Sequence, residues 1–129
     1  MFMNTDTGNI KTYAGILAVC QLLNKHRLDT HNEKVLQAQI EKIFKGENIP
    51  YEREVRLSER SIIDFIIDKE IGIEVKIKGS AKDIFRQLER YLEFDDVKAL
   101  VLVTSKAIRL PKSVKGKFTY VINLGMSWL

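Results

Sequence analysis

The sequence predicts a single α/β domain in which helices flank a mixed β-sheet. Its 129 residues match one domain that is large enough to bury its own core. Apolar residues recur at helical spacing around residues 9–26, 31–45 and 81–94. Alternating or continuous apolar runs typical of strands cover residues 51–57, 61–78, 98–104 and 118–123. The predicted order is therefore helix, helix, three antiparallel strands, helix, strand, strand.

The first predicted helix, residues 9–26, follows a loose start over residues 1–8. It carries an apolar stripe but no charged motif, so it serves either packing or an oligomer contact. Residues 1–30 then form an N-terminal extension, and residues 31–123 form the core of one domain. Trp128 lies in a short apolar tail, and a homodimer built on the first helix and this tail is one expectation.

The second helix is expected to begin after Thr30. Thr30 and Glu33 have the spacing of a capping box, in which each side chain satisfies a free backbone amide of the other residue. Glu33 also lies on the apolar stripe of this helix, whereas Glu41 is expected to point to solvent.

The central feature is a hairpin between residues 61 and 78. If Asp68 to Glu70 form a three-residue connection, Ile67 faces Ile71 and Asp64 faces Glu74. Side chains directly opposite one another lie roughly 5 Å apart, and like charges placed there are destabilising. A bound divalent cation is the simplest explanation for paired carboxylates in an apolar sheet. A slip of one residue in the register would send Glu74 to the other face.

The third helix, residues 81–94, has Ser80 as its predicted N-cap. Gln87 lies at the edge of its apolar stripe and shares one side with Tyr91, which is assigned mainly to packing. The helix connects the hairpin to the buried strand 98–104, so this strand is expected to run parallel to the central strand. A basic connection then leads to the last strand, residues 118–123.

Asp64 followed by Glu74-Val75-Lys76 resembles the active-site signature of the PD-(D/E)XK nuclease superfamily. Gln87 and Tyr91 are similar to the Gln-x-x-x-Tyr motif of its RecB-like branch, and small Holliday-junction-resolvase-like members share the same core. The residue before Asp64 is Ile63 and not proline. The resemblance covers residues 32–123 and implies a restriction-endonuclease-like mixed sheet with an added N-terminal helix.

This resemblance implies hydrolysis of DNA phosphodiester bonds with Mg²⁺ or Mn²⁺ as cofactor. Asp64 and Glu74 are the implied metal ligands, together with the main-chain carbonyl of Val75. Lys76 is expected to orient or deprotonate the attacking water and to offset charge on the phosphate. Gln87 is assigned to a metal-bound water or the phosphate, and Glu33 matches a helical glutamate that often joins the metal site. For Glu33, the metal and capping roles both stay open. A non-catalytic nucleic-acid-binding module on the same scaffold is the alternative function.

Positive charge is concentrated in the last quarter of the chain. The net charge is +4, and no acidic residue follows Asp96. Such a one-signed segment is able to hold a polyanion, or it forms a solvated basic loop. The residues assigned to DNA binding are Lys78, Lys106, Arg109, Lys112 and Lys115.

Cysteine usage and the N-terminus point to a cytoplasmic protein. The single cysteine, Cys20, excludes an intrachain disulfide and favours a reducing compartment. The N-terminus lacks the basic region of a signal peptide. The longest apolar run is too short to span a membrane, so no membrane partner is expected.

Overall fold

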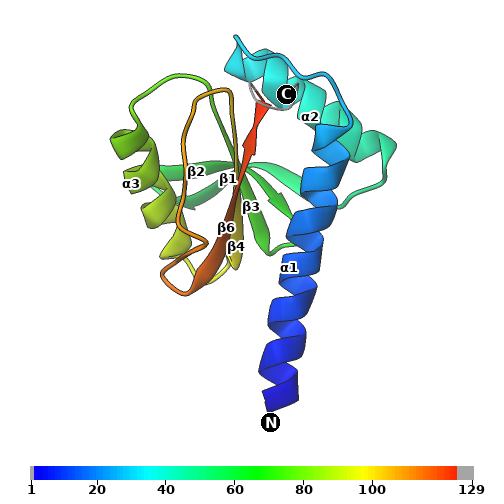
Figure 1. Cartoon of the computed structure of the whole chain (residues 1–129), viewed down its shortest axis with the longest axis vertical. Helices are drawn as coiled ribbons and strands as arrows, with labels where there is room; N and C mark the ends of the chain where they lie inside the picture. The colour runs from blue at the N-terminus through cyan, green and yellow to red at the C-terminus, as the bar shows by residue number, and fades with distance from the viewer. Residues whose placement is uncertain (1, 125–129) are drawn as a thin grey trace.

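The computed structural model describes residues 2–124 and has a mixed α/β fold, with a six-stranded mixed sheet between helices (Figure 1). In chain order the elements are α1 (Phe2–Asn24), α2 (Glu33–Gly46), β1 (Tyr51–Ser58), β2 (Ser61–Ile67), β3 (Ile71–Lys76), α3 (Ala81–Leu92), β4 (Ala99–Thr104), β5 (Ser113–Val114) and β6 (Lys117–Asn123). The sheet order is β1-β2-β3-β4-β6-β5. The predicted α/β class is confirmed.

Strand directions follow from the connections. β1, β2 and β3 form an antiparallel meander, whereas β4 pairs parallel with both β3 and β6. The predicted parallel pairing after α3 is confirmed. The helix returns the chain to the end of the sheet at which β3 began, so β4 runs in the same direction as β3. The carboxyl ends of β3, β4 and β6 therefore lie together at one end of the sheet. β5 lies inside the segment predicted as a loop and pairs only with the first residues of β6.

The register of the β2–β3 hairpin agrees with the prediction. Ile67 pairs with Ile71, and Phe65 pairs with Ile73. Asp68 and Lys69 adopt left-handed backbone conformations, with φ of 51° and 61°, and close the three-residue connection. This register brings Asp64 level with Glu74.

The sheet is covered on both faces. α1 and α2 pack on one face over a core that includes Phe65 and Ile73, and α3 packs on the other over Ile63 and Leu100. Phe65 and Ile67 face α1 and α2, while Ile66 faces α3. Burial on both faces explains why β2 is an almost continuous apolar run.

The alternation of β2 breaks at Asp64. Regular alternation would put Ile63 on the same face as Phe65, but Ile63 packs on the α3 face. β1 changes phase at the neighbouring position, because Glu54 has a φ of +52° and Val55 turns to the α3 face. The β2–β3 pairing also ends at Phe65 and Ile73. Asp64 therefore lies where β2 separates from β3.

Two predictions near the N-terminus are wrong. Residues 2–8 are not a loose segment, since α1 begins at Phe2, and Figure 1 shows its first turns extending past the sheet. The N-cap of α2 is Asn32, whose side chain accepts the Val35 amide, so Thr30 and Glu33 form no capping box. Asn32 replaces Thr30 because Asp29 accepts the His31 and Asn32 amides and turns the chain there.

The prediction that Glu41 points to solvent is also wrong. Its carboxylate accepts hydrogen bonds from the Tyr51 hydroxyl at 2.8 Å and from Arg53 at 2.7 Å. These contacts lower the pKa of Glu41, the Tyr51 bond being the larger cause. Glu41 thus ties α2 to β1. Sequence periodicity could not show this, because β1 is placed over α2 only by the folded sheet.

Two further findings concern the ends of the chain and membranes. Trp128 lies outside the described residues. None of the helices in residues 2–124 combines the length and the apolar character that crossing a bilayer requires.

Gly72→Ala is expected to destabilise the fold by about 1–3 kcal/mol, because the buried side chains of Ile63 and Leu100 must shift to admit a methyl group. A Cβ on Gly72 would lie 2.5 Å from Ile63 Cδ1 and 3.0 Å from Leu100 Cδ1. Gly46→Ala is the control, since a Cβ there meets no atom within 4 Å. Urea unfolding measures both free energies, and equal stability of the two variants would contradict the prediction.

Candidate active site

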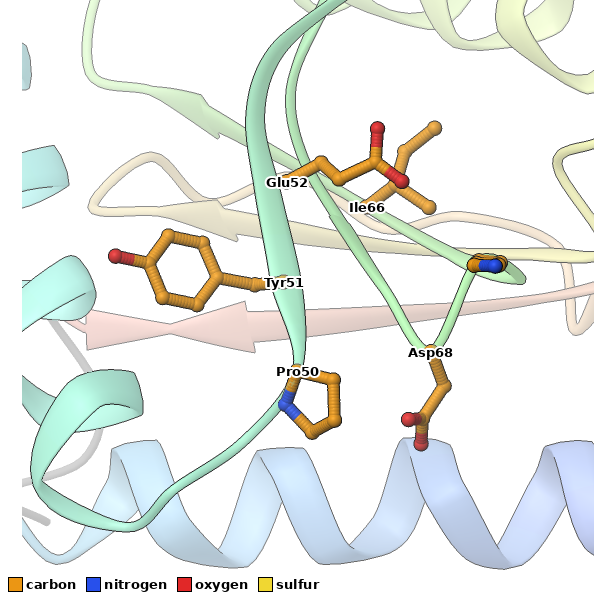
Figure 2. A pocket seen from close by; sticks show the side chains of 6 residues that line it. Pro50, Tyr51, Glu52, Ile66 and Asp68 are labelled. Atoms are coloured by element: carbon orange, nitrogen blue, oxygen red, sulfur yellow. The ribbon is translucent and has the colours of Figure 1, made fainter.

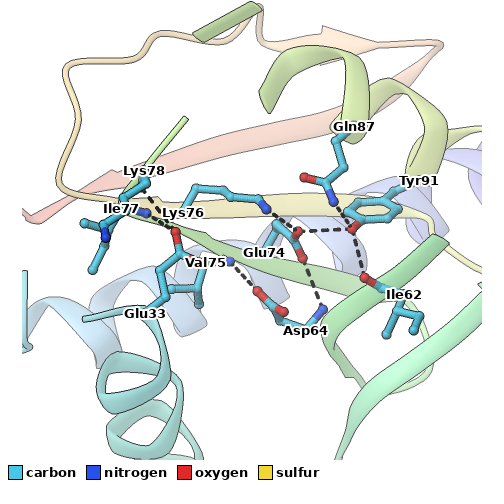
Figure 3. Close-up of polar contacts among 10 residues, drawn as sticks. All are labelled: Glu33, Ile62, Asp64, Glu74, Val75, Lys76, Ile77, Lys78, Gln87 and Tyr91. Atoms are coloured by element: carbon cyan, nitrogen blue, oxygen red, sulfur yellow. Dashed lines mark hydrogen bonds and ion pairs between the residues drawn. The ribbon is translucent and has the colours of Figure 1, made fainter. Parts of the chain in front are cut away.

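Two carboxylates meet where β2 separates from β3. Glu74 is only 2% exposed, and Asp64 is half-buried. Glu74 Oε1 accepts the Asp64 amide at 3.1 Å, and Asp64 Oδ2 accepts the Val75 amide at 2.7 Å (Figure 3). These side chains thus bind amides at the place where strand-to-strand pairing has ended. Both carboxylates are thus held in place by hydrogen bonds from backbone amides rather than from flexible side chains.

Burial raises the pKa values of both acids. It is the main cause for Asp64, where the charge of Glu33 acts in the same direction and the contact with Glu74 acts in the opposite one. For Glu74, burial and then the charge of Asp64 raise the pKa to about 8. Lys76 Nζ lies 3.7 Å from Glu74 Oε2 and acts in the opposite direction. The site therefore favours positive charge, and one lysine supplies only part of it.

Tyr91 has a polar role that the sequence interpretation missed. Its buried hydroxyl lies 2.8 Å from the Ile62 carbonyl and 3.0 Å from Glu74 Oε2. Burial and the charge of Glu74 raise the pKa of Tyr91, so the phenol stays protonated. Tyr91 orients Glu74 from α3. The sequence signal for this contact was the spacing of four residues between Gln87 and Tyr91.

Gln87 contacts the site through this tyrosine. Its Nε2 donates to the Tyr91 hydroxyl at 2.7 Å, and it makes no hydrogen bond to either carboxylate (Figure 3). The phenol proton can serve only one acceptor, so the donation from Gln87 directs it toward Ile62 or Glu74. Gln87 therefore supports the orientation of Tyr91 in this structure.

Glu33 anchors the chain just after β3. Its Oε1 accepts the Ile77 amide at 2.8 Å and the Lys78 amide at 3.2 Å. Across the part of the chain that the structure describes, no group of three or more His, Cys, Asp or Glu side chains is arranged to hold a metal ion. Glu33 is thus not the partner in a capping box, and in this structure its carboxylate bonds to the two amides that follow β3. Its charge still raises the pKa of Asp64.

The predicted basic residues divide between the two ends of the sheet, one at the carboxyl ends and one at the amino ends of the parallel strands. Lys76 is the last residue of β3, and Lys78 and Lys106 follow β3 and β4. The carboxyl ends of these strands lie at the same end of the sheet because the strands are parallel. Lys115 lies at the opposite end of β6, where its ammonium is 3.6 Å from Glu93.

Other basic residues lie away from these ends or have structural contacts. Arg109 and Lys112 are exposed on the connection between β4 and β5. Lys117 donates to the Leu92 and Phe94 carbonyls and so caps the end of α3. The basic C-terminal segment is therefore not one continuous surface beside the carboxylates.

A cavity of about 350 Å³ lies at the other end of the hairpin, beside the β2–β3 connection (Figure 2). Its lining residues are Pro50, Tyr51, Glu52, Ile66, Asp68 and Lys69. None of the predicted site residues lines it, so the cavity and the carboxylate pair are separate features.

No protein-family model, no curated protein and no solved structure matches this chain. The geometry around Asp64, Glu74 and Lys76 is therefore the basis for inferring a function.

Tyr91→Phe is expected to cost about 1–3 kcal/mol of stability, because the buried Ile62 carbonyl and Glu74 lose a shared donor. Tyr51→Phe is the matched control, since its hydroxyl bonds only the half-buried Glu41, which water can reach. Denaturant unfolding compares the two losses. A larger loss for Tyr51→Phe would contradict the assigned role of Tyr91.

In the presence of a metal chelator, the free energy of unfolding is expected to fall as pH rises from 4.5 to about 8. Over this range folded Glu74 keeps a proton that the unfolded chain has released, so deprotonation favours unfolding. The total loss is at most about 5 kcal/mol, since the pKa rises from 4.5 to about 8 and one pKa unit corresponds to about 1.4 kcal/mol. Glu74→Gln should flatten this dependence, whereas the exposed Glu59→Gln should not. Thermal melts across pH measure it, and an unchanged slope in Glu74→Gln would refute the prediction.

Proposed function

We propose that this protein is a metal-dependent nuclease that hydrolyses DNA phosphodiester bonds and has a restriction-endonuclease-like core of the PD-(D/E)XK type. The observation that carries this proposal is the convergence of two carboxylates and an ammonium group. Asp64 and Glu74 meet across the end of the β2–β3 pairing, and Lys76 reaches Glu74 from the same strand.

The donor set fits Mg²⁺ or Mn²⁺. Both are hard cations that take carboxylate oxygens, and Mg²⁺ commonly uses one or two carboxylates with water and phosphate oxygens. Asp64 Oδ1 receives no hydrogen bond from residues 2–124, so it has lone pairs for an ion. The Val75 amide points to Asp64, and the carbonyl of a strand residue points to the same side as its amide. Asp64, Glu74 and the Val75 carbonyl are thus the proposed ligands.

A bound ion would polarise the scissile phosphate and lower the pKa of a water molecule. The protein's own groups supply positioning and charge. Asp64 and Glu74 are held by backbone amides, and Tyr91 fixes the second oxygen of Glu74. Lys76 would orient the attacking water and offset negative charge that develops on the phosphate. Glu33 holds the segment that follows Lys76 and limits its movement.

DNA is the proposed substrate because the site lies beside basic residues at one end of the sheet. Lys76, Lys78 and Lys106 lie at the end of the sheet where the carboxyl ends of parallel strands meet, and α/β proteins commonly bind ligands there. Lysines at such an end attract a phosphate backbone, and the net charge of +4 acts in the same direction.

Lys76→Ala is expected to reduce cleavage at least about a hundredfold, because a charge that stabilises the transition state is lost. The assay follows branched, flapped, nicked and linear DNA with Mg²⁺ or Mn²⁺. Lys115→Ala is the control, since Lys115 pairs with Glu93 at the opposite end of the sheet and should leave cleavage unchanged. Circular dichroism verifies that both variants stay folded.

Full activity of Lys76→Ala, or no cleavage by the native chain on any of these substrates, would contradict the proposal. Calorimetric titration with Mg²⁺ then separates the two functional classes. Asp64→Asn should abolish metal uptake by the nuclease while retaining an acceptor for the Val75 amide. DNA binding without Mg²⁺ uptake in the native chain would support the non-catalytic binding module instead.

A further inference from the structure

The two edges of the sheet differ in how they are protected. β1, at one edge, carries Glu52, Arg53, Glu54 and Arg56, and its backbone is irregular at Glu54 and again between Arg56 and Ser58. Charged side chains and bulges are devices by which natural sheets prevent pairing with another strand. The β1 edge is therefore closed to strand addition.

The other edge is protected only in part. The connection between β4 and β5 contacts it at Thr119, which bonds to Pro111 and Lys112, and at the Asn123 side chain, which donates to the Lys106 carbonyl. β5 pairs with β6 only at Lys117 and Phe118, and no strand of the described chain pairs with the outer side of β6 beyond them. The segment 118–124, Phe-Thr-Tyr-Val-Ile-Asn-Leu, contains no charged residue and no proline. Its β-branched and aromatic residues have high strand propensity.

The free backbone groups of this edge can be assigned. The Thr119 amide points outward, because it donates to the Lys112 carbonyl at 3.1 Å. Strand geometry repeats every two residues, so the amides and carbonyls of Val121 and Asn123 point outward too. Those of Tyr120 and Ile122 point to β4, with which β6 pairs over residues 118–123.

Exposed aromatic side chains adjoin this edge on the α1 face. Tyr120 is 39% exposed and Tyr13 of α1 is 47% exposed. Tyr13 packs on Phe118 with a centroid distance of 5.3 Å. These three aromatic residues form a patch that continues the uncharged edge onto the surface of the sheet.

We propose that β6 pairs antiparallel with β6 of a second copy of this chain, which joins the two sheets into one. In a two-fold arrangement centred on Ile122, the outward groups of Val121 in each copy meet those of Asn123 in the other. This register uses the free outward groups of both copies and leaves the Thr119 bond to Lys112 intact.

Charge favours a second copy as the occupant. Each chain has a net charge of +4, so most pairs of like surfaces repel one another. The uncharged segment 118–124 is a surface that meets its own copy without opposing like charges. The two-fold axis also places the aromatic patches of both copies on the same face of the joined sheet, with Tyr120 of each copy opposite Leu124 of the other.

This dimer keeps the two carboxylate sites apart. Antiparallel pairing sets the carboxyl end of β6 in one copy beside the amino end of β6 in the other. The sites lie at the carboxyl ends of parallel strands, so the two sites lie at opposite ends of the joined sheet. Each copy would then act by itself, and the dimer is independent of the proposed nuclease function.

Val121→Pro is the sharpest test. Proline removes the outward amide of Val121 but leaves the pairing with β4, as edge strands tolerate. Val121→Ala is the matched control, because it loses side-chain packing and retains the amide. Tyr120→Lys is a second variant that adds charge to the patch. The mass of the full chain is measured by analytical ultracentrifugation over a range of concentrations, with thermal melts as the check on folding.

The native chain and Val121→Ala are expected to reach twice the monomer mass at high concentration, while folded Val121→Pro and Tyr120→Lys stay monomeric. Hydrogen exchange at the Val121 amide should slow as native protein concentration rises. A native chain that is monomeric throughout would overturn the proposal and leave this edge to another partner. A dimer that persists in both disrupting variants, or open-ended assembly in place of a dimer, would also overturn it.

Discussion

The end of the pairing between β2 and β3 is the constraint on which the site depends. Two neighbouring strands normally satisfy each other's amides, but this ladder stops at Phe65 and Ile73. The Asp64 and Val75 amides bind carboxylates instead. Buried amides without partners are costly, so the fold needs acceptors at this point, and the acidic side chains supply them. The same contacts that complete the backbone bonding hold two oxygen donors at a defined separation.

This arrangement stores electrostatic energy. Burial and the neighbouring charge raise the pKa of Glu74 to about 8, and Lys76 compensates only in part. In a purely structural role, an amide or hydroxyl side chain would accept the same backbone hydrogen bonds without the repulsion. An additional cation would turn the repulsion between these acids into shared attraction. The cost of the acidic pair is therefore the physical feature that most favours a metal-binding function over a structural one.

Helices on both faces support the site. On one side, Glu33 at the start of α2 holds the backbone that follows Lys76. On the other, Tyr91 of α3 reaches Glu74 and the Ile62 carbonyl, and Gln87 orients its hydroxyl. These contacts join residues that lie far apart in the sequence. The site is thus built on strands and supported by helices, which keeps its groups in place more firmly than a loop would.

Much of the fold could be predicted from the sequence, because periodicity and turn length are local properties. The alternation of residues 71–78 and the three-residue connection determined the register that sets Asp64 level with Glu74. The helix after the hairpin determined the parallel pairing of β4. Two members of the candidate site, and the strand that carries Lys76, were therefore predictable before any tertiary contact was known.

Only the tertiary structure decided what the remaining groups contact. Spacing put Glu33 on the inner stripe of its helix, but its partners, the Ile77 and Lys78 amides, are more than 40 residues away. The helical spacing of Tyr91 predicted a residue that packs in the core. Only the placement of α3 over the sheet brings its hydroxyl to Glu74. The basic residues formed one segment in the sequence, yet the direction of β6 separates Lys115 from Lys106. A one-dimensional pattern specifies the face and the register of an element, whereas the partner of a polar group depends on which other element the fold brings to that face.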